Sequence, residues 1–188
     1  MIEVLKNLKF KKEEIWSIPN IMGYFRILLI PVFCWLFLTA REDGDYYMAA
    51  AVVLVSTVTD FLDGFVARRF HMVTELGKFI DPVADKLTHG ALVICLASHY
   101  PLLWAVVVLM VLKEGYMALM GIIKLKEGKK LDGAMWYGKV CTATLFMIMF
   151  VLMLFPHIPA EAADGLILFC LGVMLFTWVM YMRAFRKL

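Results

Sequence analysis

The chain has 188 residues, of which 63% are hydrophobic and 19% charged, with a formal net charge of +3 at pH 7. A soluble domain averages nearer half apolar residues, so this composition argues against a water-soluble globular protein. We expect no nucleic-acid partner. The four cysteines are isolated within apolar runs and show no CxxC spacing, which favours plain packing over a metal or redox site.

Apolar runs recur from about Ile21 to the end of the chain, each near the ~20 residues that cross ~30 Å of hydrocarbon. The sequence therefore predicts an all-α, polytopic membrane protein with six transmembrane helices, forming one integral membrane domain over residues 1–188. The predicted spans are 21–40, 46–67, 78–98, 102–124, 134–155 and 165–184.

The segment before the first span, residues 1–17, has charges but no apolar core or cleavage site of a signal peptide. Its mixture of basic and apolar residues fits either a juxtamembrane amphipathic helix or a flexible tail. Pro19 and Asn20 precede the first span, and Asn20 is a candidate N-cap. Pro82 is expected in the first turn of the third span, where a missing N–H is tolerated.

Lysine and arginine fall almost entirely on one set of loops. That set holds fourteen of them, and the opposite set holds only Arg41. The positive-inside rule then places both termini in the cytoplasm. The fourteen are Lys6, Lys9, Lys11, Lys12, Arg68, Arg69, Lys78, Lys124, Lys126, Lys129, Lys130, Arg183, Arg186 and Lys187.

Four aspartates stand inside this apolar chain. Asp60 and Asp63 end the second span, and Asp81 and Asp85 begin the third. Spacings of three and four put each pair on one helix face, and the antiparallel spans bring both pairs to the cytoplasmic side. Ionised groups in a membrane span cost about 3 kcal/mol each on insertion scales. Two divalent cations would cancel the four charges.

Hard carboxylate oxygens suit Mg²⁺ or Mn²⁺, and two such ions form a clamp for a pyrophosphate. Small residues share the aspartate faces and leave room for a ligand near the backbone. Arg68 offers a bidentate fork for a phosphate. The residues themselves therefore predict a metal-dependent phosphate site, with the active site open to the cytoplasm.

This pattern resembles the signature of the CDP-alcohol phosphotransferase family at all eight fixed positions. They are Asp60, Asp63, Gly64, Ala67, Arg68, Gly77, Asp81 and Asp85. The run Ile18-Pro19-Asn20, a first span with Arg26, and the run from Asp81 to Lys86 look most like the family's phosphatidylglycerophosphate synthases.

The resemblance implies a homodimeric membrane enzyme of phospholipid biosynthesis. It transfers the phosphatidyl group of CDP-diacylglycerol to an acceptor alcohol and releases CMP. By resemblance, the metal ligands are Asp60, Asp63, Asp81 and Asp85, and Asp85 is also the general base. The residues that line the CDP site, by the same resemblance, are Asp60, Asp63, Gly64, Ala67, Arg68 and Gly77.

Cations inside the spans suggest an electropositive pocket for an acceptor phosphate. Its candidates are Arg26, Lys86, Lys113 and Lys139, with Lys124 and Lys126 at the inner edge. Glycerol 3-phosphate is the expected acceptor. However, Gly121 and Cys141 stand where the resembled synthases carry cations, so phosphatidylglycerol and inositol phosphate stay open as acceptors. A cation transporter is the alternative from another class, although the outer halves of the spans offer few polar residues for a conduction path.

Overall fold

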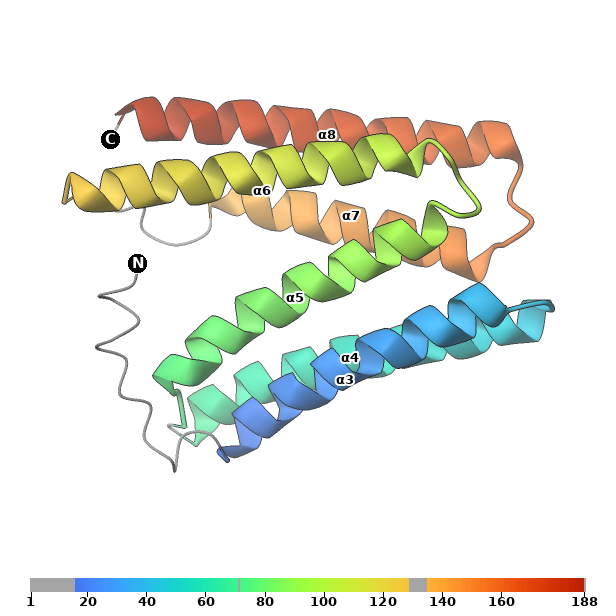
Figure 1. Ribbon diagram of the computed structural model, residues 1–188, viewed down its shortest axis with the longest axis horizontal. Helices are drawn as coiled ribbons and strands as arrows, with labels where there is room; N and C mark the ends of the chain where they lie inside the picture. The colour runs from blue at the N-terminus through green and yellow to red at the C-terminus, as the bar shows by residue number, and fades with distance from the viewer. Residues whose placement is uncertain (1–15, 71, 129–134, 188) are drawn as a thin grey trace. The chain divides into compact units, whose positions relative to one another are not determined.

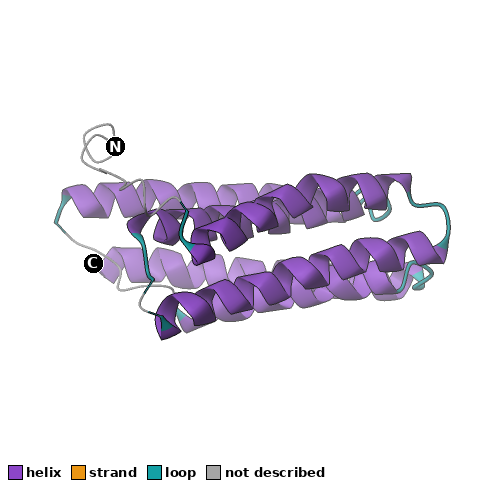
Figure 2. Ribbon diagram, turned by 90° about the horizontal axis from the view of Figure 1, so that it is seen from below, coloured by secondary structure: helices purple, strands orange, loops and turns teal. Residues whose placement is uncertain are grey.

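The structure is a computed structural model and describes residues 16–70, 72–128 and 135–187. In these ranges every regular element is a helix, as Figures 1 and 2 show. The helices are α3 (Ile18–Thr39), α4 (Asp43–Arg69), α5 (Glu75–Leu96), α6 (Leu103–Lys126), α7 (Trp136–Leu154) and α8 (Ala160–Lys187). The predicted amino-terminal amphipathic helix lies almost wholly outside the described residues.

Each predicted span coincides with one helix, and no boundary moves by more than five residues. Five of the described helices, all but α5, are long and apolar enough to cross a membrane by length and composition. Helix α5 has 22 residues, but Asp81, Asp85 and Lys86 interrupt its apolar sequence. The all-helical, polytopic fold class is therefore confirmed, and the one described helix that does not meet this criterion carries Asp81 and Asp85.

Large apolar side chains are exposed along the helices. Leu28 and Trp35 on α3 are each 66% exposed, and Phe61 on α4 is 69% exposed. In water such surfaces would be unfavourable by about 25 cal/mol per Å². Hydrocarbon removes that cost, so the exposed faces fit an integral membrane protein.

The chain divides into two compact units, Met1–Ala91 and Leu92–Leu188. In the first unit, α3 and α4 lie side by side (Figure 1). Phe33 and Phe37 of α3 are buried, and the Phe37 ring meets Tyr46 edge-on with centroids 5.4 Å apart. The small Ala49 and Ala50 of α4 are also buried. Small residues at this contact let the two helices approach closely.

In the second unit, α8 packs against both α6 and α7. The buried Tyr137 of α7 and Tyr181 of α8 meet edge-to-face, with ring centroids 4.8 Å apart. Gly138 lies directly against Tyr181, and a side chain at that position would overlap the phenol. Phe185 completes this aromatic cluster.

Two local predictions are wrong. Asn20 is not an N-cap: α3 begins at Ile18, with Ser17 in the cap position and Pro19 in the first turn, where proline favours helix initiation. Pro82 is not in a first turn either, because α5 begins seven residues earlier, at Glu75. Pro82 therefore lies in the helix interior, where it removes one backbone hydrogen bond.

Candidate active site

The predicted site lies where α4 ends and α5 begins, within the first unit. The described residues between these helices are few, so α4 and α5 run antiparallel and their aspartates reach the same level. Asp60 and Asp63 lie in the last three turns of α4, and Asp81 and Asp85 lie in the first three turns of α5. The antiparallel arrangement of α4 and α5 thus brings the two aspartate pairs together in one cluster.

All four aspartates surround the guanidinium of Arg26 from α3. Its Nη1 contacts Asp60, and lies 2.9 Å from Oδ1 of Asp85. Its Nη2 lies 2.9 Å from Oδ2 of Asp63 and 3.4 Å from Oδ1 of Asp81. Each terminal nitrogen therefore joins one carboxylate of α4 to one of α5. The predicted convergence of the aspartates is present, with Arg26 at its centre.

Exposure separates the members of this group. Side chains of Arg26 and Asp63 are only 2% and 4% exposed. Those of Asp60, Asp81 and Asp85 are 44%, 47% and 48% exposed. The cluster is therefore closed on its α3 side and open on another. One guanidinium also leaves three of the four negative charges uncompensated.

The donor set fits divalent cations. Oδ2 of Asp63 is buried, and the cation beside it in the described structure is Nη2 of Arg26 at 2.9 Å. A buried carboxylate oxygen of this kind is costly unless a cation or donor satisfies it. In the described ranges no three acidic, histidine or cysteine side chains stand together in metal-binding geometry. In this arrangement all four carboxylates contact the guanidinium of Arg26.

The predicted CDP-site residues surround the aspartates on the same two helices. Gly64 faces the Arg68 side chain: a Cβ on Gly64 would lie 3.3 Å from Nη1 of Arg68. Arg68 is exposed, and Gly64 and Ala67 are half-buried. Gly64 thus leaves space beside Asp63, and Arg68 keeps an accessible fork for a phosphate.

Gly77, on α5, has a different neighbour. A Cβ there would lie 2.7 Å from Oδ1 of Asn20 and 3.0 Å from Oγ1 of Thr74. Thr74 Oγ1 donates to Asn20 Oδ1 at 3.0 Å and accepts the Gly77 N–H at 2.9 Å. Asn20 is buried. These hydrogen bonds tie the beginning of α3 to the beginning of α5, one turn before Asp81.

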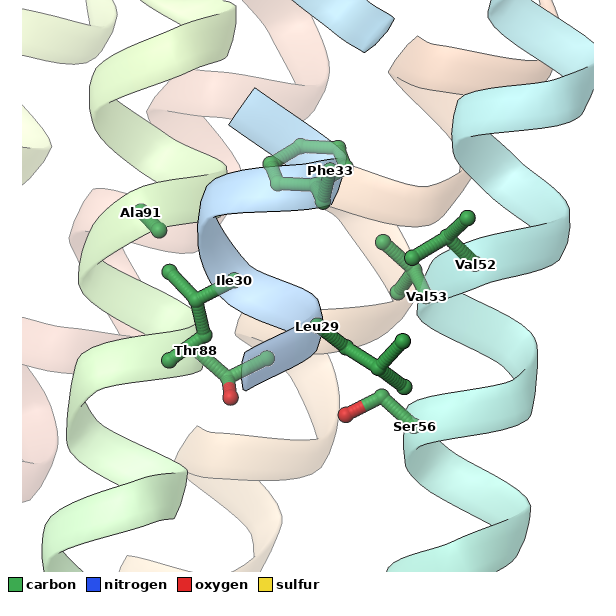
Figure 3. Close-up of a pocket in the computed structure, with 8 residues that line it drawn as sticks. All are labelled: Leu29, Ile30, Phe33, Val52, Val53, Ser56, Thr88 and Ala91. Atoms are coloured by element: carbon green, nitrogen blue, oxygen red, sulfur yellow. The ribbon is translucent and has the colours of Figure 1, made fainter. Parts of the chain in front are cut away.

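A small apolar pocket adjoins the same helices (Figure 3). Leu29, Ile30 and Phe33 of α3 line it together with residues of α4 and α5. The hydroxyls of Ser56 and Thr88 are its polar groups. Ser56 precedes Asp60 by one helical turn and Thr88 follows Asp85 by about one turn, so the polar side of the pocket borders the carboxylates.

The candidate acceptor lysines differ in burial. Lys113 of α6 is buried, lies 3.2 Å from Glu114, and points its Nζ to Sγ of Cys141 at 4.0 Å. Lys139 of α7 is exposed, as is Lys86 of α5. Lys139 is two residues from Cys141, which puts the two side chains on different faces of α7. The structure thus brings Lys113 to one face of α7 and leaves Lys139 on another.

Arg26 was expected to belong with these lysines in an electropositive pocket, and that expectation is wrong. Its charge is directed into the aspartates and is 98% shielded from solvent. The sequence signal for this role was present, because a cation inside an apolar span needs a partner. What the sequence did not contain was the packing of α3 against both α4 and α5.

The model of the family described as CDP-alcohol phosphatidyltransferase matches residues 16–185. The chain belongs to this family. It is also similar to proteins named CDP-diacylglycerol–glycerol-3-phosphate 3-phosphatidyltransferase. Relatives from Escherichia coli, Shigella sonnei and Shigella boydii are each 32% identical over 176 residues, covering 91% of this chain and 96% of theirs.

Family membership confirms the resemblance that the eight signature residues indicated. It makes this membrane protein a transferase of phospholipid biosynthesis, and it removes the support for a cation transporter. The family model extends well beyond the aspartates and covers all six described helices except the last two residues of α8. Both units therefore belong to one family region.

Proposed function

We propose that the protein transfers the phosphatidyl group of CDP-diacylglycerol to glycerol 3-phosphate, giving phosphatidylglycerophosphate and CMP. The observation that carries the proposal is the meeting of four carboxylates from α4 and α5 at one point. The names of the similar enzymes supply the donor and the acceptor. The match covers 91% of this chain and 96% of those relatives. This coverage supports assigning their complete reaction to this protein.

Two divalent ions, Mg²⁺ or Mn²⁺, are the proposed cofactors, held by Asp60, Asp63, Asp81 and Asp85. Bound ions of this kind supply positive charge that polarises a pyrophosphate and stabilises the departing phosphate. Asp63 supports the assignment because its side chain is only 4% exposed, and a buried carboxylate needs a cation beside it. The cluster's uncompensated negative charge supports it as well.

In the proposed reaction, the acceptor hydroxyl attacks the phosphorus that carries the diacylglycerol. A new oxygen–phosphorus bond forms, and the bond from that phosphorus to the oxygen bridging it to CMP breaks. The hydroxyl proton passes to the Asp85 carboxylate. Asp85 suits this role because its side chain is nearly half exposed and so is open to an incoming alcohol.

The donor's nucleotide is proposed to lie beside Gly64, Ala67, Arg68 and Gly77. Arg68 is exposed and its guanidinium can bind a phosphate with two parallel hydrogen bonds. For the acceptor phosphate we propose Lys113, Lys139 and Lys86. Lys113 already has Glu114 at 3.2 Å, so an incoming phosphate would compete with that carboxylate.

The proposed location is the cytoplasmic membrane, with both termini and the active site facing the cytoplasm. Fourteen of fifteen loop cations on one side support this orientation. A water-soluble acceptor would then enter from the cytoplasm, while the donor's acyl chains stay among membrane lipids. The proposed working form is a homodimer, which light scattering of the purified protein would test.

An acceptor panel tests the proposed function. Purified protein is incubated with CDP-diacylglycerol, Mg²⁺ and one acceptor: glycerol 3-phosphate, phosphatidylglycerol, inositol phosphate or serine. We expect phosphatidylglycerophosphate from the first, identified by mass spectrometry. Cardiolipin or an inositol lipid as the dominant product would keep the chemistry and replace the acceptor. Release of no CMP with any of them would overturn the proposal.

A further inference from the structure

Arg26 occupies the centre of the site in a way that the catalytic scheme does not use. Its Nη1 joins Asp60 to Asp85, and its Nη2 joins Asp63 to Asp81. The same four carboxylates are the proposed holders of the divalent ions. The guanidinium and the ions would therefore compete for the same oxygens.

The geometry also leaves Arg26 incompletely satisfied. Its Nε is buried and has no hydrogen-bond partner in the described structure, whereas its terminal nitrogens contact all four carboxylates. Buried polar groups are normally hydrogen-bonded, so an unsatisfied Nε in a side chain that is 2% exposed needs an explanation. One positive charge also cannot balance four carboxylates.

We propose that Arg26 is an exchangeable counter-cation. It keeps the four aspartates assembled when divalent ions are scarce, and its guanidinium must leave the cluster before the ions bind. The proposal rests on the metal site of the proposed function and assigns Arg26 a positioning role, not a catalytic one. Because the guanidinium and the ions compete for the same oxygens, Arg26 weakens metal binding while it stabilises the metal-free protein.

Mn²⁺ binding tests this competition directly. The full-length protein in detergent is titrated with Mn²⁺, and free ion is measured by electron paramagnetic resonance. Arg26→Gln should bind Mn²⁺ about tenfold more tightly than the unaltered protein, because the ions then have no guanidinium to displace from the carboxylates. Arg183→Gln makes the same chemical change at an exposed position of α8 and should leave the affinity unchanged.

Thermal unfolding supplies the second readout. In EDTA, Arg26→Gln should melt at a lower temperature than the unaltered protein, since four carboxylates then repel one another. Added Mn²⁺ should raise its melting temperature more than it raises that of the unaltered protein. If Arg26→Gln cannot be purified, Arg26→Lys keeps the charge without the fork that joins both pairs, and it too should bind Mn²⁺ more tightly.

Equal or weaker Mn²⁺ binding by the folded Arg26 variants would overturn the proposal. Different results of the same experiments would overturn the proposed function. If the unaltered protein binds no Mn²⁺, or if Asp63→Asn binds it equally well, the metal site itself is wrong. If the unaltered protein binds Mn²⁺ through Asp63 and Arg26→Gln binds it no more tightly, only the counter-cation role is excluded.

Discussion

At the scale of single residues, the four aspartates have unequal surroundings. Asp63 is 4% exposed and lies on the closed side of the cluster, against Arg26. Asp85 is 48% exposed and lies on the open side. A buried carboxylate is held by its neighbours and suits ion binding, whereas an accessible one can receive a proton from a substrate. These differences support the proposed division of roles within the group.

Asp85→Asn tests the division. The amide is similar in size but cannot accept the proton, so kcat should fall about 10²–10⁴-fold, the usual contribution of a general base. CDP-diacylglycerol and Mn²⁺ should still bind, with some loss. CMP release and equilibrium binding of the donor measure the two effects.

Asp164→Asn is the matched control for that change, because Asp164 is exposed on α8. It should leave both CMP release and donor binding unaltered. Full activity of Asp85→Asn alongside it would remove Asp85 as the base.

The acceptor lysines allow a second residue-scale prediction. If Lys139 holds an acceptor phosphate, Lys139→Ala should raise the KM for the acceptor by about tenfold, as expected for a charge-assisted contact. The kcat should change little. Lys187→Ala removes an exposed lysine from the end of α8 and should not affect this KM. An unchanged KM for Lys139→Ala would assign Lys139 a structural role.

The site was partly predictable at this scale. The spacing of Asp60, Asp63, Asp81 and Asp85 was enough to predict their convergence, because helix periodicity and antiparallel neighbours place them. The partners of Arg26 were not predictable, although a cation inside an apolar span indicates that it has some. These contacts are 34 to 59 residues away in the chain, which no local pattern encodes.

At the scale of elements, the approach of α3 to α5 sets the position of the second aspartate pair. A Cβ on Gly23 of α3 would lie 2.9 Å from Cγ2 of Ile80 and 3.8 Å from Oδ1 of Asp81. Gly77 makes the other close approach, to Asn20. Glycines on both helices therefore allow Asp81 to reach Arg26.

Gly77→Ala should disturb this crossing. The added Cβ would overlap Asn20 and Thr74, whose hydrogen bonds anchor the beginning of α5. We expect destabilisation of about 1–3 kcal/mol, the usual cost of overpacking, and a lower melting temperature. Gly121→Ala on α6 adds the same methyl group where nothing lies within 4 Å, and it should be neutral or stabilising. Equal melting temperatures would contradict the crowding at Gly77.

Helix positions were predictable because apolar length determines them, whereas helix beginnings were not. Asparagine is a favoured N-cap residue, but α3 begins before Asn20, with Pro19 in its first turn. The Asn20 side chain accepts a hydrogen bond from Thr74 instead. Proline is favoured in the first turn of a helix, yet α5 begins seven residues before Pro82. Only the Asn20–Thr74 hydrogen bond is a tertiary contact that replaces a local preference.

At the scale of the whole molecule, the distribution of basic residues predicts orientation. Reporter proteins fused to the carboxyl terminus test it: a fluorescent protein that matures in the cytoplasm should be active there, and a phosphatase that needs the opposite compartment should be inactive. The cations Arg183, Arg186 and Lys187 at the end of α8 should hold this side in the cytoplasm. The reverse pattern of reporter activity would contradict the predicted orientation.

The most direct test of the central claim is metal-dependent CMP release by the purified protein. With CDP-diacylglycerol and glycerol 3-phosphate, CMP and phosphatidylglycerophosphate should appear in equal amounts, stop when EDTA removes the ions, and return when Mg²⁺ is restored. Asp60→Asn, Asp63→Asn and Asp81→Asn should each abolish both products. Undiminished CMP release in EDTA, or in any of these three variants, would contradict the claim that the four aspartates form a metal-dependent transferase site.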